Sequence, residues 1–452
     1  MTGTPLRRNP ASAAAAPPRI VHLGLGAFHR AHQAWYTAHA ADAADWTIAA
    51  FTGRAPRAAD ELSRQNGLYT LIERGPDRDR AEIVPTIAEA HPAGDVARLE
   101  ELLAAPATAL VTLTITEPAY RLRPDGTLDV TDAAVVADIA ALRARAAPAT
   151  PLGRLLSGLR ARRSADAGPI AIVPCDNLPD NGARVRAALT GLARAVDPAL
   201  EAWLREQTSV VSTSVDRITP RATDADRATA AALTGFYDAS PVVAEPFADW
   251  VLCGRFPNGR PQWETAGARF VDDIGPWERR KLLLLNGAHS LLASQGLLRG
   301  HTTVAEAMSD PGIRAWVERY WDEAVRHLPA ELDLDAYRRA LAERFANARI
   351  AHHLAQIAED GATKLALRVV PVLRAERAAG RGGDASLGAI AAWIRLVRTG
   401  AAARDAKQPA IERARRSADP VRALLAVLDP GIATDDVAAA VTAAEPATVG
   451  AA

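Results

Sequence analysis

The chain has 452 residues, with 53 basic and 53 acidic side chains and a formal net charge of zero. Because the two signs are interspersed, neither nucleic acid nor an anionic membrane surface is an expected partner, and no apolar stretch reaches the ~20 residues of a membrane span. The length predicts two domains, and the two cysteines, Cys175 and Cys253, form neither a disulfide framework nor a metal spacing, which is typical of a reduced cytoplasm.

The amino-terminal segment, residues 1–18, is expected to be a flexible tail. It contains Arg7 and Arg8 followed by Ala, Ser and Pro residues, but no apolar region follows the two arginines. A secretion signal needs such a region, so this interpretation is rejected.

Residues 19–274 are expected to form an α/β domain of the Rossmann type with a mainly parallel sheet. Short apolar runs alternate there with helical patterns, which is typical of βαβ units. The predicted strands are Ile20–Leu23, Trp46–Phe51, Leu68–Glu73, Ala109–Leu113 and Ile170–Val173, and the first predicted helices cover 30–44 and 57–65.

The first predicted strand leads into a glycine-rich turn that opens directly into a helix. Two glycines let the backbone turn tightly and approach a pyrophosphate at the helix N-terminus. His29 stands where the third glycine of a dinucleotide fingerprint is expected, so a merely tight turn is the alternative. The predicted cofactor-binding residues are Gly24, Leu25, Gly26, Ala27, Phe28, His29 and Arg30.

The stretch after the second predicted strand bears on the choice between NAD(H) and NADP(H). Dinucleotide folds often carry Asp or Glu here to bind the adenosine ribose, but no carboxylate appears before Asp60. Arg54 or Arg57 could instead bind a 2′-phosphate, which favours NADP(H). The alternative is that both arginines are simply solvated.

A polar cluster follows the predicted strand Ile170–Val173. Because parallel sheets bind ligands at the carboxyl ends of their strands, Asn177 is well placed to reach a substrate. Asn, Asp, Pro and Gly are also turn residues, so a plain Asx turn at residues 174–182 is the alternative. Composition does not separate the two.

Residues 275–445 are expected to form a helical domain, and residues 446–452 a frayed tail. Strand patterns end at about Asp273, and the breaker pair Gly275-Pro276 follows. Helices are predicted over 312–326, 334–345, 349–357, 388–397 and 420–428.

Lysine is rare in this chain, because only Lys281, Lys364 and Lys407 occur among the 53 basic residues. Arginine replaces lysine on most solvated surfaces but does not give up its proton, whereas a desolvated lysine amine can act as a base. A rare lysine therefore indicates a role that arginine cannot fill.

Lys281 stands in a run that is predicted to be one largely buried helix. At ~100° per residue, Glu278, Lys281, Asn286 and His289 fall within an arc of roughly 140°. Polar groups on one face of a buried helix are costly unless they converge on something polar. The alternative is an ordinary helix with an exposed Lys–Glu pair and a locally satisfied Asn and His.

Pairs of histidines invite a metal-binding interpretation, which is rejected. His29 and His32 are three residues apart, and His352 and His353 are adjacent. No carboxylate or cysteine stands at a matching spacing. No metal is therefore expected.

Several stretches follow one another in an order that is typical of a known family. They are Ile20–Gln33, Leu113–Glu117, Cys175–Pro179, Val215–Pro220, Glu245–Phe247, Lys281–His289, Arg344–Asn347 and Asp360–Lys364. Together they resemble the mannitol dehydrogenase family, the zinc-independent long-chain polyol and hexonate dehydrogenases. The resemblance covers most of the chain.

This resemblance implies a Rossmann-type domain and a helical domain with the substrate held in the cleft between them. It implies that Lys281 is the general base and that Asn177 and Asn286 are the pair of amides on the reacting oxygen. It also implies that His289 contacts a substrate hydroxyl.

Three carboxylates complete the set of catalytic residues that the resemblance implies. Glu278 and Glu117 match carboxylates that link the lysine to solvent, and Asp216 matches a position near the site. The implied reaction interconverts a secondary alcohol and a ketone on a sugar-derived substrate, with neutral Lys281 taking the alcohol proton while hydride passes to NAD or NADP. An unperturbed lysine has a pKa of ~10.4, so the site is expected to favour the neutral amine.

The expected substrate pair is D-mannonate and D-fructuronate, as for a fructuronate reductase. Gln356 stands where mannitol-type members tend to carry arginine, although Ala362 and the pair Leu365-Ala366 depart from common family residues. The alternatives are D-mannitol and D-fructose, another polyol, or a catalytically silent dinucleotide-binding sensor. The protein is expected to be cytoplasmic and to act as a monomer or small homo-oligomer.

Overall fold

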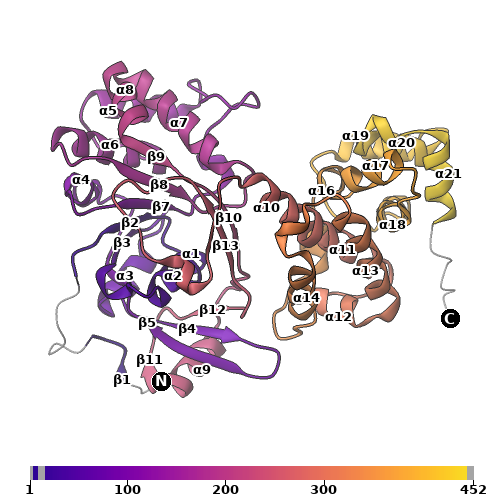
Figure 1. The fold of residues 1–452 in the computed structure, drawn as a ribbon, viewed down its shortest axis with the longest axis horizontal. Coiled ribbons are helices and arrows are strands. Elements are labelled where there is room, and N and C mark those ends of the chain that lie inside the picture. Colours follow the sequence, from indigo (N-terminus) through magenta and orange to yellow (C-terminus); the bar gives the residue numbers. More distant parts are fainter. Residues whose placement is uncertain (1–3, 9–15, 445–452) are drawn as a thin grey trace. The chain divides into compact units, whose positions relative to one another are not determined.

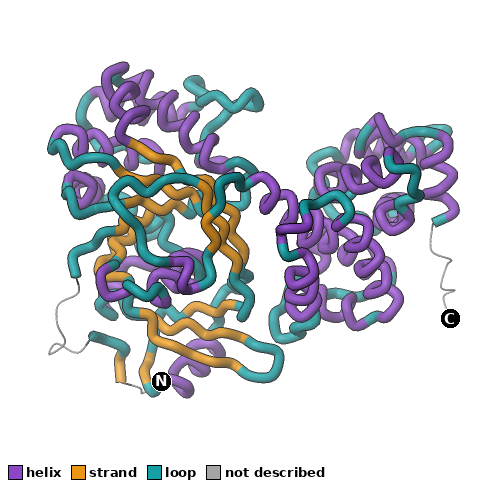
Figure 2. The backbone as a smooth tube through the Cα atoms, viewed as in Figure 1, coloured by secondary structure: helices purple, strands orange, loops and turns teal. Residues whose placement is uncertain are grey.

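The computed structural model of the chain describes residues 4–8 and 16–444. The chain divides into two compact units, Met1–Ile274 and Gly275–Ala452. The first mixes strands and helices, and the second is built from helices and loops (Figure 2). Within the described residues, no helix has the length and apolar character needed to cross a membrane.

Unit 1 is organised around a six-stranded parallel sheet in the order β6-β3-β2-β7-β8-β9 (Figure 1). Its strands are β2 (Ile20–Leu23), β3 (Ile48–Phe51), β6 (Ile87–His91), β7 (Leu110–Leu113), β8 (Ile170–Pro174) and β9 (Thr208–Val210). The chain order reverses between β2 and β7, which is where doubly wound sheets bind their ligands. The predicted α/β fold with a parallel sheet is confirmed.

Helices cover both faces of this sheet, because alternate strand residues are apolar on both sides. Ile20 and Leu110 face the core shared with α1, α2 and α3, whereas Val21 and Val111 face the core shared with α4 to α8. The helices of unit 1 are α1 (Ala27–Ala31), α2 (Gln33–His39), α3 (Arg57–Arg64), α4 (Val96–Ala104), α5 (Ala133–Arg143), α6 (Pro151–Ser164), α7 (Asn181–Val196), α8 (Pro198–Gln207) and α9 (Asp224–Thr234).

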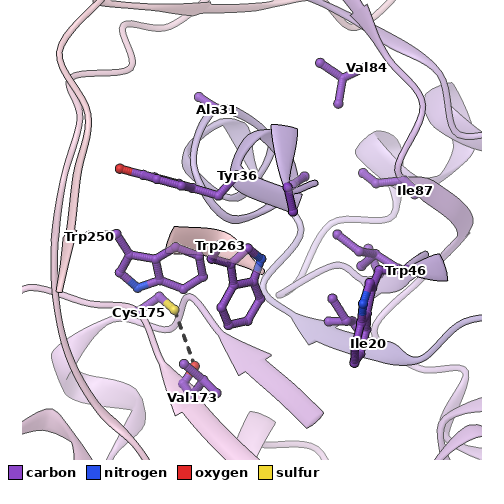
Figure 3. Packing of buried hydrophobic residues seen from close by; sticks show 14 of the residues in the cluster. Ile20, Ala31, Tyr36, Trp46, Val84, Ile87, Val173, Cys175, Trp250 and Trp263 are labelled. Carbon is purple, nitrogen blue, oxygen red and sulfur yellow. Dashed lines mark hydrogen bonds between the residues drawn. The ribbon is translucent and has the colours of Figure 1, made fainter. Parts of the chain in front are cut away.

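The first core is rich in aromatic side chains. Trp250 and Trp263 pack with ring centroids 4.5 Å apart, and Tyr36 lies beside Trp250 (Figure 3). The Cys175 thiol donates a hydrogen bond to the Val173 carbonyl at 3.4 Å, and burial raises its pKa. Cys175 is therefore an unreactive part of this core.

Three smaller sheets complete unit 1. The predicted strand Leu68–Glu73 is β4 (Tyr69–Arg74), but it lies outside the parallel sheet, in the order β12-β4-β5. The remaining strands are β1 (Thr4–Pro5), β5 (Asp79–Val84), β10 (Ser212–Asp216), β11 (Phe236–Tyr237), β12 (Val242–Ala244), β13 (Asp249–Cys253) and β14 (Arg269–Phe270). Short 3-10 helices are η1 (Ala43–Asp45), η2 (Glu117–Ala119) and η3 (Trp263–Ala266).

The segment expected as a flexible tail differs from that expectation at residues 4–8. Strand β1 pairs in parallel with β11, and Leu6 is only 2% exposed. The Arg8 guanidinium donates to the Asn66 carbonyl at 2.9 Å. These contacts are made with residues far along the chain, so the local composition of the segment does not reveal them.

Unit 2 contains no strand within its described residues, and its predicted helical class is confirmed. Its helices are α10 (Gly275–Arg280), α11 (Gly287–Leu298), α12 (Val304–Ser309), α13 (Pro311–Val325), α14 (Leu334–Phe345), α15 (Leu354–Ala358), α16 (Gly361–Arg368), α17 (Val370–Ala378), α18 (Asp384–Thr399), α19 (Gln408–Arg415), α20 (Pro420–Leu428) and α21 (Asp435–Ala443). The short helices are the π-helix η4 (Lys281–Asn286) and the 3-10 helices η5 (Ala330–Leu332) and η6 (Pro430–Ile432).

Two predictions for unit 2 need correction. The helix predicted over 349–357 is only α15, because residues 349–353 form a turn and an isolated bridge between Thr303 and His353. The single α-helix predicted through Lys281 is interrupted by η4, where hydrogen bonds join residues five apart instead of four.

Candidate active site

Predicted site residues of unit 1 gather at one edge of the parallel sheet. The Gly24 turn follows β2, Arg54 follows β3, Glu117 follows β7, and Asn177 follows β8. These are the carboxyl ends of neighbouring parallel strands, so they meet at the same edge. Asp216 is placed elsewhere, at the end of β10 in the sheet β10-β13-β14.

Gly24 and Gly26 play different roles in the turn after β2. Gly24 has a φ of +116°, and a Cβ there would lie 2.3 Å from the Thr114 carbonyl oxygen, so the fold itself demands glycine. Gly26 has an extended backbone with a φ of −147°, and a Cβ there would meet only the Gly24 carbonyl oxygen, at 3.6 Å. The packing of this chain therefore does not require a glycine at position 26.

His29, at the position of the missing third glycine, lies inside the fold. Its ring is 0% exposed and stacks on His22 with centroids 3.4 Å apart and planes 9° from parallel. Burial lowers the pKa of His22 to about 3 and that of His29 well below its usual value. Both imidazoles are therefore neutral at physiological pH.

His22 joins the turn to the neighbouring strand. The Thr114 hydroxyl donates its one proton to the Gly24 carbonyl at 2.8 Å, so it accepts from His22 Nε2 at 3.0 Å. In this neutral tautomer His22 Nδ1 is an acceptor and takes the Thr112 hydroxyl proton at 2.8 Å. This chain of hydrogen bonds, from Thr112 through His22 and Thr114 to Gly24, fixes the turn.

The side chain of Arg30, like that of His29, is buried within the fold. Arg30 is 6% exposed, and its Nε donates to the Gly26 carbonyl at 3.2 Å while its Nη1 donates to the Ser240 carbonyl. Both side chains support the turn from within.

The segment after β3 carries two exposed arginines, of which one is paired with a carboxylate. Arg54 is exposed, whereas Arg57 pairs with Glu61 at 2.7 Å. Arg154 of α6, which no sequence pattern singles out, is 5% exposed and donates to the carbonyls of Ala93 at 2.6 Å and Gly53 at 3.3 Å. The second hydrogen bond fixes the backbone at Gly53, where a Cβ would meet open space.

The Asx turn expected as the alternative in this segment is formed by Asp176, the neighbour of Asn177. The Asp176 carboxylate accepts from the Leu178 amide at 2.9 Å and from the Tyr120 hydroxyl. Buried Asn181 anchors the following helix by accepting from the Thr213 amide at 2.9 Å. Asn177 is left exposed at the end of β8.

Unit 2 brings Glu278, Lys281, Asn286 and His289 together along α10, η4 and α11. The first three are half-buried, and His289 is 7% exposed. Lys281 begins the π-helix and Asn286 ends it. Because the two residues are five apart, they lie on the same side of a π turn, and the arc computed for a regular α-helix does not apply.

His289 lies among cations and aromatic rings. Its ring centroid is 4.8 Å from those of Phe345 and His352, and its Nε2 has no hydrogen-bond partner within the described chain. Burial lowers its pKa, helped by His352, Arg344, Arg368 and Lys364. A neutral imidazole with an unsatisfied nitrogen can bind a hydroxyl group.

The histidines singled out in the sequence take part in packing. His32 Nε2 lies 3.1 Å from the Asp249 carbonyl oxygen, and His352 packs edge-on against His289. Between residues 4 and 444, the described side chains contain no group of three or more His, Cys, Asp or Glu able to hold a metal ion.

Both units match one protein family. The mannitol dehydrogenase Rossmann domain matches residues 18–265, and the mannitol dehydrogenase C-terminal domain matches residues 273–444.

Named relatives and a solved structure agree with this match. The D-mannonate oxidoreductase of Escherichia coli K12 is 38% identical over 367 residues, covering 79% of this chain and 75% of that protein. The mannitol 2-dehydrogenase of Cereibacter sphaeroides is 37% identical, covering 80% and 77%. The ternary complex of Pseudomonas fluorescens mannitol 2-dehydrogenase with NAD and D-mannitol superposes with a TM-score of 0.78 at 33% identity, covering 98% and 94%.

Proposed function

The chain belongs to the mannitol dehydrogenase family, and from this membership we propose that it oxidises D-mannonate and reduces D-fructuronate with NAD(H) or NADP(H). The family consists of oxidoreductases that act on polyols and hexonates. The observation that carries the choice of a hexonate is a pair of cations near His289, Lys364 and Arg368, which form no ion pair within the described residues.

Lys281 is the proposed acid and base. A nicotinamide coenzyme, when bound, accepts or supplies the hydride. The neutral Lys281 amine takes the proton from the alcohol oxygen in oxidation, and the ammonium returns it in reduction. Asn177 and Asn286 donate hydrogen bonds to that oxygen as negative charge develops on it, and His289 Nε2 holds a further substrate hydroxyl.

The remaining carboxylates have supporting roles in this proposal. Glu278 and Glu117 exchange the lysine proton with solvent, and Asp216 lies near the substrate. The coenzyme pyrophosphate binds along the turn from Gly24 to Arg30, with the half-buried Gly26 and Ala27 closest to it. The open space beside Gly26 supports this placement.

Lys364 and Arg368, on α16, support an anionic substrate. The Arg368 guanidinium lies 3.2 Å from the Ser290 hydroxyl, one residue from His289, and burial lowers its pKa to about 10. Burial also lowers the pKa of Lys364, whose amine donates to the Ile357 carbonyl at 3.0 Å. Neither cation forms an ion pair in the described parts of the chain, although Asp360, Glu359 and Asp405 partly offset the lowering of the Lys364 pKa. A half-buried cation that has no ion-paired carboxylate favours an anion.

The proposal is tested by reducing D-fructuronate and D-fructose with purified protein. We expect a higher kcat/KM for fructuronate, because its carboxylate can bind the α16 cations. Lys364→Met should lower kcat/KM for fructuronate by roughly ten- to a hundred-fold, the value of a hydrogen bond to a charged group, and that for fructose by less than three-fold.

Lys407→Met is the matched control, because the Lys407 amine is also half-buried and bonded to a backbone carbonyl, that of Val427. It should leave both substrates unaffected. Higher activity with fructose would show that D-mannitol and D-fructose, and not the hexonates, are the substrate pair. No turnover with either substrate would favour a catalytically silent dinucleotide-binding sensor.

Coenzyme preference is proposed to rest on Arg54. The exposed guanidinium stands after β3 where many dinucleotide folds carry a carboxylate, so NADPH should be accepted at least as well as NADH. Arg54→Ala should lower kcat/KM for NADPH relative to that for NADH by about ten-fold, through loss of a charged hydrogen bond.

Arg57→Ala serves as the control for this measurement, since Arg57 is paired with Glu61 and should not change the ratio. An unaltered ratio of the two specificity constants in the Arg54 variant would make Arg54 an ordinary surface charge.

A further inference from the structure

The π-helix η4 determines how Lys281 and Asn286 are placed. Residues five apart lie about 140° apart around a regular α-helix, which would put these two side chains on different faces. In η4 the Gly287 amide instead bonds the Leu282 carbonyl, five residues back. This pattern stacks residue i over residue i+5 and brings Lys281 and Asn286 to one side.

Side chains of other helices bond to the backbone of this segment. Trp321 of α13 is 2% exposed, and its indole N–H donates to the Leu284 carbonyl at 2.9 Å. The Asn286 carbonyl accepts from the Ser290 hydroxyl at 3.2 Å and from the Arg368 guanidinium at 3.4 Å. A donor that enters the backbone ladder in this way is a known cause of local departure from α-helical geometry.

Helix α13 also packs closely against the end of η4. A Cβ at Gly287 would lie 2.1 Å from the Tyr320 hydroxyl oxygen, so α13 contacts the end of the π turn at the backbone. That hydroxyl donates to the Arg368 carbonyl at 2.9 Å, which ties α13 to α16. Neighbouring residues of α13 thus contact both the middle and the end of η4.

We propose that Trp321 is a positioning residue for catalysis, which holds η4 in its π conformation and so aligns the Lys281 amine with the Asn286 carboxamide. This inference rests on the proposed roles of Lys281 and Asn286. Its physical basis is that a π turn is rare and persists only where the surroundings favour it. Trp321 has no contact with the reacting atoms in this proposal and acts only through the Leu284 carbonyl.

The test is Trp321→Phe, which keeps an apolar aromatic ring and removes the N–H donor. We expect kcat to fall by roughly ten- to a hundred-fold, since a displacement of about 1 Å in a catalytic group has effects of this size. KM for the sugar substrate and the dissociation constant of the coenzyme should change by less than two-fold. Trp316→Phe on the same helix is the matched control, because Trp316 packs beside Gly388. This variant should keep the kcat of the wild type.

Hydrogen exchange provides a readout that does not depend on activity. In Trp321→Phe the amides of residues 281–287 should exchange faster, while the rest of α11 and α13 exchange at wild-type rates. If Trp321→Phe does not accumulate as folded protein, Gly287→Ala replaces it, because its Cβ displaces Tyr320 and the adjoining part of α13. The same fall in kcat and faster exchange at 281–287 are then expected, together with faster exchange in α13 beside Tyr320.

Three outcomes would overturn the inference. The first is a kcat within two-fold of wild type with unchanged exchange at 281–287. The second is faster exchange throughout unit 2, and the third is a loss of kcat accompanied by an equal loss of coenzyme affinity. Failure of the proposed function is distinguishable, because it would appear as near-normal turnover when Lys281 itself is changed.

Discussion

Replacing Lys281 with arginine is expected to lower kcat by roughly 10²-fold to 10⁴-fold. The substitution keeps the positive charge and most of the length of the side chain, but arginine does not exchange its proton at accessible pH. Because the proposed coenzyme turn belongs to unit 1, the dissociation constants of NADH and NADPH should remain within two-fold of wild type. Steady-state turnover and fluorescence titration of the coenzyme measure the two quantities.

Lys407→Arg is the matched control, since it makes the same substitution at a lysine bonded to the Val427 carbonyl. It should leave turnover unchanged. Near-normal turnover of Lys281→Arg would show that Lys281 is only a cation, and the proposed mechanism would then be wrong.

Gly26→Val is expected to abolish binding of NADH and NADPH. The fold tolerates a side chain there, because the backbone is extended and a Cβ would meet only the Gly24 carbonyl oxygen, at 3.6 Å. A bulky group would instead fill the space where the pyrophosphate approaches the turn. Isothermal titration with each coenzyme measures the loss.

The unfolding midpoint of Gly26→Val should stay within a few degrees of wild type, and Gly26→Ala should bind with intermediate affinity. Gly24→Val should instead destabilise the protein itself, because the Thr114 carbonyl leaves no room for its Cβ. Unchanged coenzyme affinity in a folded Gly26→Val protein would exclude the turn as the pyrophosphate site.

Much of the fold could be predicted because it is encoded locally. Strand β2 begins and ends where the apolar run Ile20–Leu23 does, and α14 and α20 match their predicted ranges. Buried parallel strands are continuous apolar runs, and amphipathic helices repeat their apolar residues with the helical period. Both patterns are visible in a single sequence.

The candidate site could be predicted only in part. The rarity of lysine directed attention to Lys281, whose role stays a prediction, but nothing in its run of leucines indicates a π turn. That conformation accompanies a hydrogen bond from Trp321, 37 positions from Leu284 along the chain. Arg154 and Arg368 were missed for the same reason, because their partners are backbone carbonyls brought close only by folding.

His29 illustrates a second limit. Its place in the turn suggested contact with a phosphate, but its ring is buried against His22. The stacking partner is only seven residues away, yet the alternation of strand residues and the turn at Gly24 must both be known before the two rings can be brought together. A motif gives the position of a residue in the chain and not the direction of its side chain.

The pairing of β1 with β11 affects the order in which unit 1 can be completed on the ribosome. Thr4 pairs with Phe236, so about 230 further residues must be synthesised before the first strand can find its partner, which takes roughly 10 to 50 s at usual elongation rates. The parallel sheet can assemble from β2 onward during that time. Strand β1, although synthesised before the parallel sheet, is therefore among the last parts of unit 1 to reach its final contacts.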